Sequence, residues 1–194
     1  MIDVNTQTWA LIGVVVVLLA VVGWLLYQRN ESRRLQQRFG AEYKRAVSAA
    51  GDPGKAEADL RAREKRVAKL ALVPLAPAVA ARFGEAWSRL QGRFVDDPNG
   101  AVVDADELVR ELMQARGYPM GDFESRAADI SVDHPRVVEN YRAAQAIATR
   151  ASRNAAETED LRRAVIHYRA LFSELLEVKH AEPRSTTRQH EVRT

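Results

Sequence analysis

The longest apolar run in the sequence lies close to its N-terminal end. The nineteen residues from Trp9 to Tyr27 contain no charged side chain. A helix of this length spans about 28 Å, close to the roughly 30 Å hydrocarbon thickness of a bilayer. Trp9 opens the run, and Trp24 and Tyr27 close it, at the depths that amphipathic aromatic rings prefer. The run predicts a transmembrane helix over 9–27, preceded by a short segment, 1–8.

Two other kinds of segment can contain such an apolar run. A cleaved signal peptide has a positively charged region before its apolar core, and residues 1–8 contain no Lys or Arg. A buried core helix seldom runs this far without a polar residue. A retained membrane anchor is therefore the favoured interpretation.

Beyond the anchor, apolar residues recur with the period of amphipathic helices, and no useful length shows the alternation typical of strands. The strongest stripe lies between Val79 and Phe94. The chain is therefore predicted to be all-α, with one N-terminal transmembrane helix followed by a soluble domain of about six amphipathic helices. The residues expected to build its core are Phe83, Trp87, Leu90, Phe94, Leu108, Leu112, Tyr141, Leu171 and Leu175.

Aspartate and proline residues mark where several of these helices should begin. Asp97, followed by Pro98, is expected to be an N-cap with proline at the first helical position. Asp122 is expected to cap a short helix. Asp133, followed by His134 and Pro135, is expected to cap and open the next helix.

The charges beside the apolar run predict its orientation. A single charged side chain, Asp3, precedes the run, whereas Arg29, Arg33, Arg34 and Arg38 follow it closely. Because positive charge stays on the cytoplasmic side of a membrane protein, the N-terminus is expected outside and the C-terminal domain in the cytoplasm. An anchored extracytoplasmic domain remains the alternative.

Charge also divides the rest of the chain. Residues 28–69 hold twelve Lys or Arg against six Asp or Glu, a net charge of +6, and form a basic juxtamembrane helical neck. Residues 70–177 hold thirteen Lys or Arg against seventeen Asp or Glu, a net charge of −4. The helical domain, 70–178, is therefore mildly acidic. The polar, aperiodic segment 179–194 is predicted to be a disordered tail.

The basic neck has three interpretations. It can set the topology and otherwise be a solvated surface. Its arginines at positions 29, 33, 34 and 38 can also contact anionic lipid headgroups, since basic side chains near an anionic leaflet are attracted to it. Nucleic acid is the third and least favoured partner, because only Phe39 and Tyr43 could stack on bases there and their spacing indicates packing.

An ordered series of short motifs carries a resemblance to a known family. In chain order the motifs are RFGAEY (38–43), RFVDDP (93–98), RGYP (116–119), DFE (122–124), SVDHP (131–135), VENYR (138–142) and HYRALF (167–172). Together with the anchor, they resemble an uncharacterised family of single-pass bacterial membrane proteins common in high-GC genomes. The resemblance implies a bacterial inner (cell) membrane protein and implies no activity, ligand or site.

Few residues suggest chemistry. The chain has no cysteine, which excludes disulfides and thiolate chemistry, and it has no phosphate-binding loop or nucleophile elbow. Its four histidines lack metal-ligand spacing, so neither a metal nor another cofactor is expected. The densest polar cluster lies in 116–142, and with one later histidine it supplies a candidate ligand site made of Tyr118, Asp133, His134, Glu139 and His167.

Two classes of function remain. The leading hypothesis is a non-enzymatic, membrane-anchored helical interaction or scaffold module that binds an unknown protein partner. The alternative is a small ligand-binding or enzymatic domain that uses the 116–142 loops. Convergence of the candidate ligand residues in one concave pocket would favour the alternative.

Overall fold

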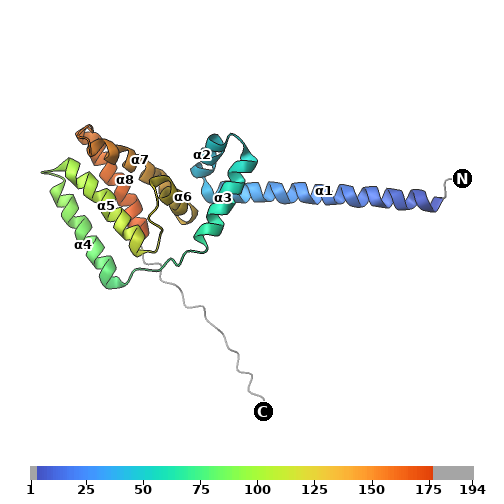
Figure 1. Ribbon diagram of the computed structural model, residues 1–194, viewed down its shortest axis with the longest axis horizontal. Coiled ribbons are helices and arrows are strands. Elements are labelled where there is room, and N and C mark those ends of the chain that lie inside the picture. Colours follow the sequence, from blue (N-terminus) through green and yellow to red (C-terminus); the bar gives the residue numbers. More distant parts are fainter. Residues whose placement is uncertain (1–3, 177–194) are drawn as a thin grey trace, which may run out of the picture.

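The protein is all-α, as the sequence predicts. The structure is a computed structural model that describes residues 4–176, and it contains eight helices and no strand within that range (Figure 1). The helices are α1 (Val4–Phe39), α2 (Ala41–Ala50), α3 (Pro53–Val67), α4 (Pro77–Arg93), α5 (Pro98–Ala115), α6 (Phe123–Asp133), α7 (Val138–Ala151) and α8 (Thr158–Leu176). The tail predicted over 179–194 lies outside the described residues.

Helix α1 carries the apolar run and projects alone from the rest of the molecule (Figure 1). Its apolar side chains lie open, with exposed fractions of 61% for Trp24 and 71% for Tyr27. It is long and apolar enough to cross a membrane, and it is the one such helix in the described part of the chain. The helix continues past the apolar run to Phe39, so the first part of the neck is a direct extension of the helix that carries this run.

A glycine ends α1 and starts a helical hairpin. Gly40 has φ +53° and ψ −119°, a conformation that a side chain would strain, so the chain turns there instead of continuing as one helix. Because of this break, seven helices follow α1, compared with the about six that the sequence predicts. Helices α2 and α3 pack antiparallel to each other and against the end of α1 (Figure 1). Their small apolar core contains Leu35, Phe39, Tyr43, Ala46, Ala56, Leu60 and Val67, together with Val132 of α6.

Helices α4 to α8 form a bundle around a second, larger core. Trp87 of α4 stacks on Phe172 of α8 with ring centroids 4.7 Å apart. Of the expected core residues, Trp87, Leu90, Leu112, Tyr141, Leu171 and Leu175 are buried. Phe83, Phe94 and Leu108 are partly buried and pack against this core from its edge.

The predicted helix starts are confirmed at two aspartates and wrong at a third. The carboxylate of Asp97 accepts the backbone N–H of Gly100 at 2.9 Å, and that of Asp122 accepts the N–H of Ser125 at 2.8 Å. Asp133 is instead the last residue of α6, and α7 begins at Val138 without a side-chain cap. Pro135 is the reason, because it disfavours helical geometry at the residue before it and so ends α6.

Ion pairs of buried carboxylates connect the hairpin to the bundle. Glu42 of α2 is 1% exposed, and one of its oxygens accepts from Arg63 of α3 at 3.0 Å and from Arg142 of α7 at 3.1 Å. Arg66 of α3 pairs with the buried Asp129 of α6 at 2.6 Å. These contacts fix the bundle at a defined position beside the end of α1.

Candidate functional site

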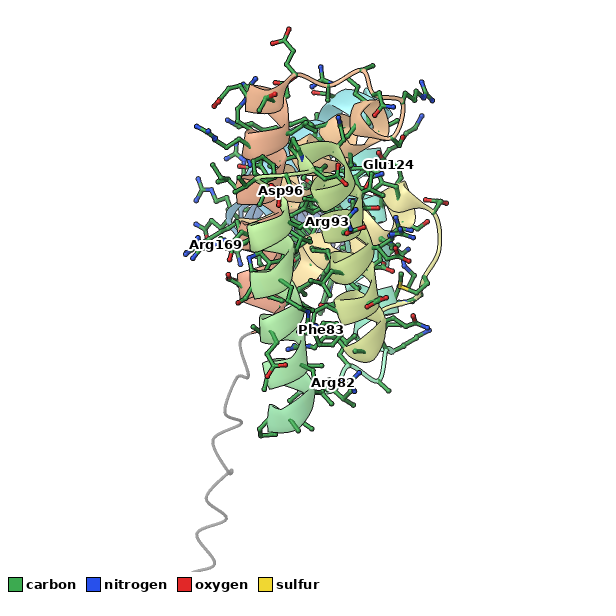
Figure 2. All side chains as sticks on the ribbon, turned by 90° about the vertical axis from the view of Figure 1, so that its left-hand side faces the viewer. Arg82, Phe83, Arg93, Asp96, Glu124 and Arg169 are labelled. Carbon is green, nitrogen blue, oxygen red and sulfur yellow. The ribbon has the colours of Figure 1, made fainter. Side chains whose placement is uncertain are left out.

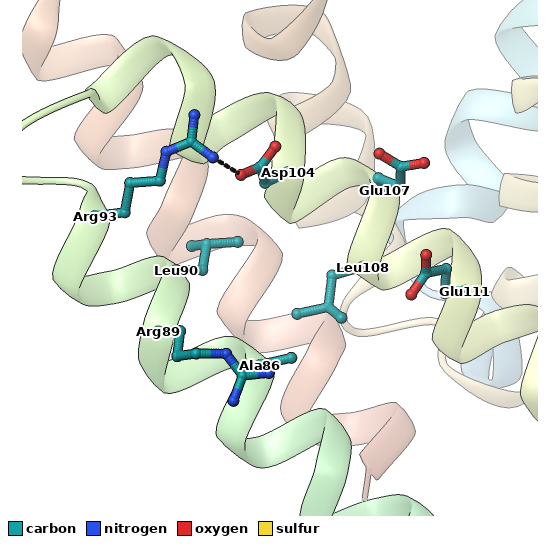
Figure 3. Close-up of a pocket in the computed structure, with 8 residues that line it drawn as sticks. All are labelled: Ala86, Arg89, Leu90, Arg93, Asp104, Glu107, Leu108 and Glu111. Atoms are coloured by element: carbon teal, nitrogen blue, oxygen red, sulfur yellow. Dashed lines mark hydrogen bonds and ion pairs between the residues drawn. The ribbon is translucent and has the colours of Figure 1, made fainter.

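A groove runs along the bundle between α4 and α5. Two adjoining hollows of about 320 and 370 Å³ share four lining residues, so they form one groove. The shared residues are Ala86, Arg89, Leu108 and Glu111. Figure 3 shows the part of the groove nearest the α4–α5 turn, with residues of both helices facing each other across it.

The groove arises because α4 lies at the outside of the bundle. The apolar stripe of α4 turns Trp87 and Leu90 inward, where they are buried. Phe83 and Leu108 lie at the edge of this contact and stay partly buried, so they leave an apolar floor between the two helices. Figure 2 views this end of the molecule, with α4 in front and Phe83 on it.

The two walls of the groove carry opposite charges. The α4 wall presents three arginines, Arg82, Arg89 and Arg93, and one carboxylate, Glu85, so it is basic on balance. The α5 wall presents carboxylates, those of Asp104, Glu107 and Glu111 (Figure 3). Near the α4–α5 turn the walls are bridged, since Arg93 pairs with Asp104 at 2.5 Å and also with Asp97 at 2.8 Å. The bond to Asp97 raises the pKa of the Arg93 guanidinium.

Away from that turn the charged walls are open. Arg89 makes only a loose contact with Glu85, at 3.9 Å, and both side chains are 72% exposed. Arg82, Glu107 and Glu111 have no ion-pair partner among residues 4–176. The fourteen-residue rise from Val79 to Arg93 gives the groove a length of about 21 Å. These dimensions fit about four turns of a helix.

The candidate ligand residues of 116–142 are divided among separate contacts. The buried Tyr118 hydroxyl donates to Asp133 at 3.4 Å, and burial, followed by the charge of Asp133, raises the pKa of that hydroxyl. His134 is buried and its Nδ1 lies 3.1 Å from the Glu174 carboxylate.

The other two candidates lie elsewhere. His167 Nδ1 lies 3.0 Å from the side-chain oxygen of Asn140, and Glu139 is exposed. No group of three or more potential metal ligands occurs within the described residues. Hydrogen bonding joins Tyr118 to Asp133, but it gives each histidine a different partner.

The four candidate lipid-contacting arginines fall into two pairs. Arg34 bridges Glu31 and Glu64 at 2.7 and 2.8 Å, and Arg38 pairs with Glu64 at 3.0 Å. Arg29 and Arg33 are exposed and have no acidic partner in the part of the chain that the structure describes.

Sequence reasoning did not predict the groove. A local signal existed, because the arginines at 82, 89 and 93 flank the strongest apolar stripe and acidic residues recur at 104, 107 and 111. That signal does not say that the two charged rows face each other, since this depends on how α4 and α5 pack.

Comparison of the chain with protein-family models, with curated proteins and with solved structures gave no match. The resemblance to a bacterial membrane-protein family therefore stays a prediction from the sequence motifs.

Proposed function

We propose that this protein is a membrane-anchored helical interaction module. In this proposal α1 crosses a bacterial cell membrane once, with its N-terminus outside, and the helical domain lies in the cytoplasm. The length of α1, its open apolar surface and the arginines that follow it support this arrangement.

The groove between α4 and α5 is the observation that carries the proposal. It has an apolar floor and two walls of opposite charge, and it opens at the end of the molecule away from the start of α1 (Figures 1 and 2). An amphipathic helix bound in a groove buries its apolar face there and places its flanks against the walls.

The charges of the groove support one kind of occupant. We propose an amphipathic helix of a partner protein, about four turns long. Its flank toward α4 carries carboxylates that meet Arg82 and Arg89, and its flank toward α5 carries Lys or Arg that meet Glu107 and Glu111. Opposite charges on the two flanks also set the direction in which the helix binds, because the reversed helix would bring like charges together.

Photo-crosslinking in native membranes tests this proposal. A photoreactive amino acid replaces Ala86 in the groove of the full-length chain, and Ser152, which is exposed at the end of α7, is the matched control position. We expect an adduct from position 86 and none from position 152. Mass spectrometry of the adduct should identify a peptide with an apolar stripe between an acidic flank and a basic flank.

Charge reversal provides the second arm of the experiment. Arg89→Glu and Glu111→Lys should each lower the yield of the adduct, because each brings like charges together in the groove. An adduct that maps to a second copy of this chain, or a yield that ignores both reversals, would overturn the assigned occupant. Absence of any adduct from position 86 would overturn the groove as the docking surface.

A further inference from the structure

The α2–α3 hairpin is held at a fixed height along α1. Glu57 of α3 is buried, and its carboxylate accepts from the hydroxyl of Ser32 on α1 and from that of Tyr43 at 2.9 Å. Further along both helices, Glu64 accepts from Arg34. Helix α3 therefore lies across α1 only a few residues beyond the apolar run (Figure 1).

This height coincides with the edge of a bilayer if α1 is the anchor. Ser32 follows Tyr27 by five residues, which is about 7.5 Å of helix. The headgroup layer adds about 5–8 Å to the hydrocarbon core on each side. Where α1 leaves the membrane, α3 would therefore lie at the outer edge of the headgroups.

Arg61 shows which side of α3 faces that edge. Helical residues follow each other at about 100°, so Arg61 lies about 40° around α3 from Glu57, and Lys65 lies about 40° further on. The hydrogen bond from Arg34, together with the charges of Arg34 and Arg61, lowers the pKa of Glu31 on α1. Arg61 therefore lies near Glu31, which is closer to the apolar run than Ser32, the partner of Glu57.

That side of α3 is basic. Arg61 and Lys65 are four residues apart, and Lys69 continues the spacing in the turn after α3. Lys65 and Lys69 are exposed, and they lie on the side of the helix away from the buried Leu60 and Val67. Neither lysine has an acidic partner within residues 4–176.

Helix α1 contributes two more cations at the same level. Arg29 and Arg33 lie about 3 and 9 Å beyond Tyr27. Arg29 is about 120° and Arg33 about 160° around α1 from Leu35, which is buried against the hairpin, so both face away from the hairpin. Arg34 and Arg38, by contrast, are held by Glu31 and Glu64.

We infer that Arg29, Arg33, Arg61, Lys65 and Lys69 form a basic collar around α1 that binds anionic lipid headgroups. The inference rests on the proposed membrane anchoring and deepens it, since it assigns the collar to the leaflet from which the hairpin emerges. It also revises the set taken from the sequence, because Arg34 and Arg38 serve the packing of the hairpin instead of the lipid. The ligand is a surface of phosphatidylglycerol-type headgroups, each with one negative phosphate.

Lipid selectivity of the full-length chain tests the collar. The chain is reconstituted in phosphatidylcholine vesicles, and electron spin resonance compares how strongly it retains spin-labelled phosphatidylglycerol and spin-labelled phosphatidylcholine beside it. A basic side chain near an anionic surface contributes about fivefold to binding. The triple variant Arg61→Gln, Lys65→Gln, Lys69→Gln should therefore lose most of the preference for phosphatidylglycerol.

Two controls make the result specific. A bundle variant with the same loss of charge, Arg153→Gln, Arg162→Gln, Arg169→Gln, should keep the preference, because these exposed arginines lie on the distal bundle. The charge-conserving variant Arg61→Lys should also keep it. Equal loss in the collar and bundle variants would overturn the collar, as would a wild-type chain without any preference.

Two further measurements separate the remaining outcomes. Inorganic phosphate at millimolar concentration should not displace the labelled lipid, and displacement would show a single phosphate site instead of a headgroup surface. Alkaline carbonate extraction from vesicles made only of phosphatidylcholine tests the anchor alone. A chain that is extracted there refutes the anchoring, whereas a retained chain without lipid preference refutes only the collar.

Discussion

Trp87 is central to the packing of the bundle, yet its polar atom is not hydrogen-bonded. It is 6% exposed and stacks on Phe172, which joins the outer helix α4 to α8. Its indole N–H is buried and has no hydrogen-bond partner among the described residues. A buried donor without a partner typically costs about 1–3 kcal/mol. The ring therefore stabilises the bundle, and its polar atom opposes that effect.

Two substitutions at Trp87 separate these contributions. Trp87→Ala should lower the free energy of unfolding by about 3–5 kcal/mol, because it removes the stacked ring and leaves a cavity. Trp87→Phe keeps a ring on Phe172 and removes the unpaired N–H, so it should cost less than about 1.5 kcal/mol. Denaturant unfolding of the full chain in detergent, followed by helical circular dichroism, measures both. Equal losses would show that the stack contributes little.

At the scale of the element, helix starts were predictable wherever the signal is local. An N-cap depends on residues within one turn, so Asp97 and Asp122 could be recognised from their neighbours in the sequence. Asp133 shows the limit of this reasoning. There an aspartate followed two residues later by a proline ends a helix instead of opening one, and only the extent of α6 decides between the two.

Asp122 and Asp133 make a matched pair for testing this distinction. Asp122→Ala should lower the melting temperature by a few degrees, because the N–H of Ser125 loses its acceptor. Asp133→Asn should leave it unchanged or raise it slightly, because the amide oxygen can still accept from the Tyr118 hydroxyl and the charge that the helix dipole disfavours at a C-terminus is removed. Thermal unfolding of both variants under identical conditions checks the ranking, and the reverse order would contradict the assigned helix ends.

The same cap predicts a dependence on pH. The N–H of Ser125 lowers the pKa of Asp122 in the folded chain. The carboxylate therefore contributes stability above its unfolded pKa of about 3.9, and this contribution is lost as the pH falls through the folded pKa. Asp122→Asn does not titrate there, so its melting temperature should fall less than that of the parent over this range. Parallel melting curves of the two proteins would disprove the coupling.

At the scale of the whole molecule, the junction between hairpin and bundle could not be predicted. Hydropathy and charge were enough to predict the all-α class and a basic segment beside the apolar run. Glu42 and Arg142, however, are 100 residues apart in the sequence, and Arg66 and Asp129 are 63 apart. Each looks like an ordinary surface charge until the fold brings its partner near. The groove between α4 and α5 escaped prediction for the same reason.

Removal of Glu42 should release the hairpin from the bundle. Glu42→Gln removes the carboxylate shared by the partly buried Arg63 and Arg142, which keep Asp59 and Glu124 as their second partners. The cost should therefore be below the roughly 3–5 kcal/mol that is typical when breaking an ion pair leaves a buried charge without any partner. Hydrogen exchange should then accelerate at least tenfold in α2 and at the start of α7, with little change in α8. Glu85→Gln, which removes an exposed partner of Arg89, is the control and should leave exchange unchanged in all three helices.

The unbroken course of α1 from Val4 to Phe39 has a mechanical consequence. If α1 is the anchor, its rigidity couples the direction in which the bundle points to the face of α1 that contacts a neighbouring protein in the membrane. One alanine inserted after Gln28 would rotate the bundle by about 100° around the axis of α1. Seven inserted residues would restore the original direction of the bundle to within about 20° and move the bundle by about 10.5 Å along the axis of α1. The direction in which the groove points is thus encoded in the phase of the helix.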